Sequence, residues 1–85
     1  MKVIVAGLPG IKMYRALLNA EAAIAEFNDE VHLNPVQDIS VMRERGAIYT
    51  PTVIVENNIV STGRIPSVYE FKGWIQKELN SEFSE

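Results

Sequence analysis

The 85-residue chain contains no cysteine and only one histidine, His32. Without cysteine it forms no disulfide, offers no thiolate nucleophile and builds no zinc site from sulfur ligands. A single histidine also excludes a metal centre rich in imidazole ligands. We therefore expect no metal site and no cofactor. We expect His32 to be a surface or half-buried residue and not a catalyst, since the pattern places no nucleophile or carboxylate beside it.

The sequence also lacks long apolar runs and an excess of basic residues. Its first apolar run ends at Gly7, too early for a secretion signal or for the ~20 residues of a membrane helix. Eight lysines and arginines stand against eleven acidic residues, a net charge of −3. No basic stripe alternates with aromatic residues, as nucleic-acid-binding surfaces require. We expect a cytoplasmic protein that binds neither membrane nor nucleic acid.

The chain has enough hydrophobic residues to form the core of one small domain. Hydrophobic residues make up 47% of the chain, which is normal for a packed globule. A chain of this length has room for a single core. We predict one domain over residues 1–80, followed by a polar C-terminal tail over residues 81–85.

The pattern of apolar residues predicts a mixed α/β chain. Runs of β-branched residues at 3–5 and 52–55 are typical of central strands that are covered on both faces. Apolar positions spaced by three and four follow Gly10 and Ser67, as in amphipathic helices. The predicted order is strand 2–6, helix 11–27, strand 30–34, short helix 38–45, strand 52–55, strand 59–62 and helix 68–79.

The first predicted helix has an unusually broad apolar stripe. Its centre has the spacing of a core-facing helix side, and further apolar residues widen it on one side. The central positions are Met13, Leu17, Ala20, Ile24 and Phe27, and the widening positions are Tyr14, Leu18, Ala22 and Ala25.

Turn and cap residues set the expected ends of these elements. Asp38 is a candidate N-cap and Gly46 fits the C′ position of the short helix. Asn57-Asn58 predicts a two-residue hairpin turn, because asparagine tolerates positive φ. Ser67 and Glu70 have the spacing of a capping box ahead of the last helix. Gly73, inside that helix, suggests a close packing contact there.

The element order β-α-β-α-β-β-α constrains the sheet. The first two strands should be parallel through a right-handed crossover, and the last two should form an antiparallel hairpin. Pro35 cannot donate to a ladder, so strand 30–34 is expected at an edge. The prediction is an α/β fold with one mixed four-stranded sheet, strands 2–6 and 52–55 at its centre, and helices on both faces.

These elements and three local motifs resemble the thioredoxin fold, in particular small thioredoxin-like and glutaredoxin-like proteins, over residues 1–79. In that family the first strand leads into a loop with C-x-x-C, and the matching positions here are Gly10 and Met13. Residues 49–53, Tyr-Thr-Pro-Thr-Val, match the segment whose proline is cis in the family. Gly63-Arg64 matches the glycine that follows the hairpin. The resemblance implies the strand order 2-1-3-4.

The resemblance implies a protein that has lost dithiol exchange, because Gly10 and Met13 occupy the two cysteine positions. Cysteine-free branches of the fold act through protein contacts, and in the family the backbone of Thr50 would pair with a peptide or glutathione. We interpret the chain as a redox-inactive domain that binds a protein, peptide or small anion in the vestigial groove. The expected groove residues are Leu8, Pro9, Gly10, Ile11, Lys12, Met13, Tyr49, Thr50, Pro51, Gly63 and Arg64.

Two other interpretations stay open at this point. One is an enzyme that works without thiols at the same groove, with Lys12, Arg15 or Tyr14 as its polar group. The other is a structural or dimerising subunit whose groove is plugged by Leu8 and Met13. We expect a monomer or a weak dimer. We do not expect nucleotide hydrolysis, since the glycines near Lys12 do not have the spacing of a phosphate-binding loop.

Overall fold

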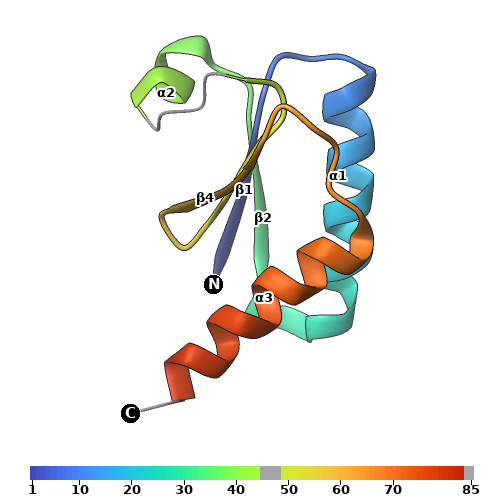
Figure 1. The fold of residues 1–85 in the computed structure, drawn as a ribbon, viewed down its shortest axis with the longest axis vertical. Coiled ribbons are helices and arrows are strands. Elements are labelled where there is room, and N and C mark those ends of the chain that lie inside the picture. The colour runs from blue at the N-terminus through green and yellow to red at the C-terminus, as the bar shows by residue number, and fades with distance from the viewer. Residues whose placement is uncertain (45–48, 84–85) are drawn as a thin grey trace.

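The computed structural model describes residues 1–44 and 49–83 as an α/β domain (Figure 1). Its elements are β1 (Lys2–Ala6), α1 (Ile11–Ile24), the 3₁₀ helix η1 (Ala25–Glu30), β2 (His32–Val36), α2 (Ile39–Glu44), β3 (Thr52–Val55), β4 (Asn58–Thr62) and α3 (Val68–Phe83). No described helix is long and apolar enough to cross a membrane.

The four strands form one mixed sheet in the order β2-β1-β3-β4. β1 runs parallel to β2 and antiparallel to β3, and β3 and β4 form an antiparallel hairpin. This topology confirms the predicted fold class and strand order. The two strands rich in β-branched residues lie at the centre, where both of their faces are covered.

The core has two parts, one on each face of the sheet. Val3, Val5, Val53 and Val55 belong to the larger cluster, which also contains residues of α1 and α3. The alternate side chains of β1 and β3 point the other way and pack with Met42 of α2. Because side chains of a strand alternate between faces, these two central strands hold both helical layers.

The edge strand β2 lies two residues later in the sequence than predicted and contains Pro35. Its position is set by pairing with β1, which starts with Lys2 opposite His32 and ends with Ala6 opposite Val36. The His32 N–H donates to the Met1 carbonyl, and the Val36 carbonyl accepts from Gly7. Residues 32 and 36 therefore direct their backbone groups toward β1, and Pro35 directs its own outward. A proline at that position costs no ladder hydrogen bond.

The hairpin turn is centred on Glu56-Asn57, so the predicted Asn57-Asn58 turn is wrong by one residue. Both central residues have positive φ, 46° at Glu56 and 71° at Asn57. Contacts with β1 hold this register, because the Glu56 N–H donates to the Lys2 carbonyl and Glu56 Oε1 accepts from the Lys2 N–H. A bulge lets β4 regain its pairing, since Ile54 faces Ile59 and Val53 faces Ser61.

The helix ends agree with most of the cap predictions. Asp38 Oδ1 accepts from the Ser40 N–H at 2.9 Å, as an N-cap does. Ser67 and Glu70 form the predicted capping box, with N–H···O distances of 3.1 and 3.2 Å. Gly46 lies outside the described residues.

Three helix predictions need correction or extension. The helix predicted over 11–27 becomes a 3₁₀ helix after Ile24, a tightening that is common in the last turn. Gly73 is exposed, and no heavy atom lies within 4 Å of an added Cβ, so the predicted packing contact is absent. α3 continues to Phe83, into the segment expected to be a tail.

Candidate functional site

The loop from Gly7 to Gly10, between β1 and α1, is the first part of the candidate site. The Gly7 N–H donates to the Val36 carbonyl at 2.9 Å, so the loop starts against β2. A Cβ on Gly7 would lie 2.7 Å from Thr50 Cγ2 and 3.1 Å from Met13 Sδ. Only glycine fits at this point, and its small size lets the loop pack directly against the Thr50 segment.

Hydrogen bonds link this loop to the segment at Thr50, and link that segment in turn to Gly63. The Leu8 N–H donates to Thr50 Oγ1 at 3.1 Å. The Gly63 N–H donates to the carbonyl of Pro51 at 2.9 Å. The Thr50–Pro51 peptide bond is cis, and Pro51 is fully buried. Three stretches that are far apart in the sequence, 8–13, 49–51 and 63–64, therefore meet at one end of the sheet.

The positions that match the two family cysteines have opposite environments. Gly10 is exposed, and an added Cβ would meet no heavy atom within 4 Å. Met13 is only 1% exposed and belongs to the large core cluster. The flexible thioether fills space beside Gly7 and Thr50 that a thiol occupies in C-x-x-C proteins. The position that matches the first family cysteine is thus exposed, and the position that matches the second is packed in the core.

Apolar side chains border the open side of the site. Leu8 is 49% exposed and Tyr49 is 63% exposed. Ile11, in the first turn of α1, is the most exposed of these three. The hydrogen bond from the Leu8 N–H to Thr50 Oγ1 joins the two backbone segments that carry Leu8 and Tyr49. The three heavy atoms nearest to an added Cβ on Gly7 belong to Thr50 and Met13.

Arg64 is engaged by a neighbouring carboxylate. Its guanidinium donates twice to Glu70, once from Nη1 to Oε1 at 2.9 Å. This pairing, together with the Ser67 N–H, lowers the pKa of Glu70 to about 2, and it raises the pKa of Arg64. Glu70 thereby fixes the loop before α3 and neutralises the arginine that was predicted to border the groove.

The polar residues suggested for a thiol-free enzyme do not converge on the groove. The buried residues of α1 include Met13, Ala16 and Ala20. Tyr14 and Arg15 lie on the opposite side by helical periodicity, and both are exposed. Lys12 is also exposed. We therefore propose no catalytic role for them. Among residues 1–44 and 49–83, no three His, Asp or Glu side chains are grouped to hold a metal.

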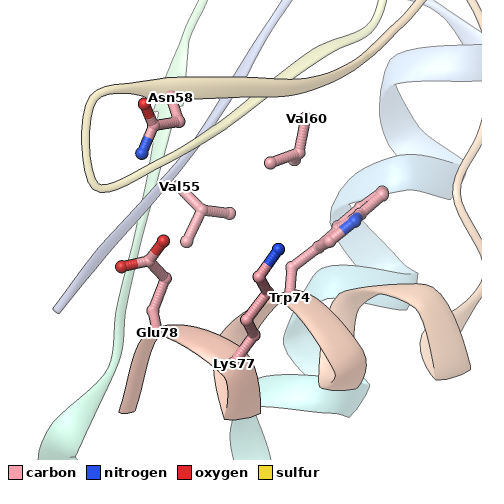
Figure 2. Close-up of a pocket in the computed structure, with 6 residues that line it drawn as sticks. All are labelled: Val55, Asn58, Val60, Trp74, Lys77 and Glu78. Atoms are coloured by element: carbon pink, nitrogen blue, oxygen red, sulfur yellow. The ribbon is translucent and has the colours of Figure 1, made fainter. Parts of the chain in front are cut away.

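A pocket of about 300 Å³ lies elsewhere, between α3 and the β3–β4 hairpin (Figure 2). Figure 2 shows Val55, Val60 and Trp74 along its wall, with Lys77 and Glu78 extending from α3 toward the hairpin. The pocket lies at the far end of β3 from Pro51. Sequence reasoning missed it, because its shape depends on the hairpin register. We assign it no ligand, since its charged residues are adjacent on one exposed helix side.

The element order, the sheet topology and the position of Thr50-Pro51 opposite the first loop define a thioredoxin-type α/β domain. A family model described as "Thioredoxin domain" matches residues 1–76, and the chain belongs to this family. No match was found among curated proteins, nor among solved structures. Because the chain has no cysteine, the dithiol exchange that a C-x-x-C motif performs is absent from this member.

Proposed function

We propose that this thioredoxin-family domain binds an extended segment of another polypeptide in its vestigial groove, without thiol chemistry. The groove is bordered by residues 8–13, 49–51 and 63–64. The proposal is supported by the contrast between the packed interior of the groove and its exposed apolar border. Met13 keeps the interior packed, and the rim exposes Leu8 and Tyr49.

The observation that carries the proposal is the backbone of Thr50. Among the described residues, neither its N–H nor its carbonyl forms a backbone hydrogen bond. A donor and an acceptor on one residue that have no partner among the described residues can pair with an added strand, and neighbouring side chains then give specificity. Leu8, whose N–H bonds to Thr50 Oγ1, and Tyr49, which precedes Thr50, supply exposed apolar surface. A peptide fits this site better than a small anion, because Arg64 already pairs with Glu70.

The test is an NMR titration of the full chain with extended hexapeptides that carry apolar residues at alternate positions. We expect the amide signals of Leu8, Ile11, Thr50 and Gly63 to shift together. Glutathione and inorganic phosphate serve as comparison ligands and should give weaker shifts. Shifts confined to other residues, or no shifts with any peptide, would refute the proposal.

A matched pair of variants sharpens this experiment. Leu8→Ser removes an apolar side chain that is 49% exposed at the groove, and Ile59→Ser removes one that is 47% exposed on β4. We expect Leu8→Ser to weaken peptide binding about tenfold, since each buried apolar side chain contributes on the order of 1.5 kcal/mol. Ile59→Ser should bind as the unchanged chain does. Equal effects of both variants would mean that the groove is not the binding site.

A further inference from the structure

The outer face of α1 is apolar along its whole length. Its buried residues point toward the sheet, and a second apolar stripe lies on the opposite side of the helix. Tyr14 and Leu18 are 63% and 45% exposed in this stripe. The outer stripe consists of Ile11, Tyr14, Leu18 and Ala22 of α1 and of Ala25 at the start of η1, and all five residues are exposed.

A helix that covers a sheet normally exposes a polar face to solvent. α1 instead has apolar residues on both sides, with Lys12, Arg15 and Glu21 flanking the outer stripe. The sequence prediction treated the outer residues as a widening of the core stripe, but the structure leaves them uncovered. Figure 1 shows α1 along one side of the molecule, with no described element over its outer side. This face therefore has the composition of a contact surface.

The spacing of the outer stripe is symmetric about Leu18. From Ile11 to Ala25 the steps along the chain are three, four, four and three residues. In an antiparallel pair of such helices with its two-fold axis at Leu18, each Leu18 meets its own copy. Tyr14 then faces Ala22, and Ile11 faces Ala25. Tyr14 and Ile11 are thus each opposite an alanine, which favours close packing around the central Leu18 pair.

We propose that the outer face of α1 is the contact surface of a symmetric homodimer, in which two copies of α1 pack antiparallel about Leu18. Such a contact is isologous, with the same patch on both copies. With the axis at Leu18, the spacing of the stripe lets a second copy place an apolar residue opposite each apolar residue of the first.

The charges near the stripe agree with the antiparallel arrangement. Lys12 and Arg15 lie in the N-terminal half of α1, so the antiparallel pair keeps the basic groups of the two copies apart. The two Arg15 positions are separated by roughly 9 Å along the helix axis, at a rise of about 1.5 Å per residue. The two helix dipoles are also antiparallel in this arrangement, so that opposite partial charges lie side by side. A parallel pair would place these cations side by side.

The expected dimer is weak and reversible. A single pair of helices of this length buries less than the ~1,200 Å² of a standard interface. We therefore expect the dimer to have a dissociation constant between about 10 µM and about 1 mM. Ile11 also belongs to the groove, but Leu18 does not, so a Leu18 variant tests the dimer without altering the proposed peptide site.

The first test is sedimentation equilibrium of the full chain at rising concentration. We expect the unchanged chain to associate and Leu18→Arg to remain monomeric, because two arginines would meet at the axis. Tyr69→Arg is the matched control, since Tyr69 is 85% exposed on α3 and is not a member of the stripe. It should associate as the unchanged chain does. A chain that stays monomeric at about 1 mM, or a Leu18→Arg variant that still dimerises, overturns the proposal.

The second test uses the absence of cysteine. A single Leu18→Cys substitution provides the only thiol, and under oxidised glutathione it should form disulfide-linked dimers at least tenfold faster than Tyr69→Cys. Orientation follows from mixing Ile11→Cys with Ala25→Cys. The antiparallel arrangement predicts the mixed dimer, whereas a parallel one predicts Ile11–Ile11 crosslinks. Equal rates for Leu18→Cys and Tyr69→Cys, or a predominance of parallel crosslinks, would contradict the proposal.

Discussion

Gly7 and Thr50 are packed so closely that a single methyl group would not fit between them. A Cβ at position 7 would lie 2.7 Å from the Cγ2 atom of Thr50 and 3.1 Å from Met13 Sδ. This contact joins the first loop to the segment before β3. It also closes the interior of the site where a dithiol would act in other members of the family.

Gly7→Ala should therefore destabilise the fold. Overpacking of this kind costs about 1–3 kcal/mol, because Thr50 and Met13 must shift to make room. Urea unfolding followed by circular dichroism would measure the change in the free energy of unfolding. A variant as stable as the unchanged chain would mean that Thr50 can move away freely.

Gly73→Ala should have the opposite effect. Gly73 is exposed in the interior of α3, and an added Cβ would meet open space. Alanine has the higher helix propensity, so we expect a gain of roughly 0.5–1 kcal/mol in the free energy of unfolding. The same urea experiment measures it. A loss of stability would show that the glycine serves a contact after all.

Met13→Ala should destabilise the fold strongly. Met13 is 1% exposed in the main core cluster, and removing such a side chain typically costs about 2–5 kcal/mol through lost burial and the cavity left behind. Lys12→Ala, at the exposed neighbouring position, is the control and should change stability by less than about 0.5 kcal/mol. Similar losses for both variants would argue against Met13 as a core residue.

Acid should remove one specific stabilising contribution. The pKa of Glu70 is lowered to about 2 in the folded chain by Arg64 and by the Ser67 N–H. Because folding lowers this pKa, the carboxylate stabilises the fold above its unfolded pKa of about 4.3. The contribution is lost as the pH falls toward about 2.

Glu70→Gln should therefore flatten the dependence of stability on pH between about 4.5 and 2. Arg64→Gln should raise the pKa of Glu70 only part of the way, since the Ser67 contact remains. NMR titration of the Glu70 side chain in the unchanged chain and in Arg64→Gln measures the pKa of Glu70 directly. A pKa that does not move in Arg64→Gln would mean that the ion pair is not its main cause.

Local patterns were sufficient to predict most of the fold. Consecutive β-branched residues marked β1 and β3, because only a strand covered on both faces buries every side chain in such a run. The capping box at Ser67 was predicted because both of its hydrogen bonds are made within four residues. The resemblance in residues 49–53 placed Thr50 and Pro51 directly before β3.

Features that depend on long-range pairing were not predictable from local patterns. The turn moved to Glu56 because that residue bonds to Lys2, which lies far away in the sequence. The outer face of α1 was misjudged, since periodicity shows that Tyr14 and Leu18 share a side but not whether another element covers it. The prediction of groove binding remains to be tested by the titration described above.

Both edges of the sheet resist the addition of further copies. Pro35 removes an outward N–H from β2, and the bulge between Val53 and Ile54 makes the pairing along β4 irregular. Irregular or donor-poor edges hinder the strand-by-strand growth of fibrils. The two-fold contact proposed for α1 would involve neither sheet edge, and such a contact closes on itself, so growth would stop at two chains.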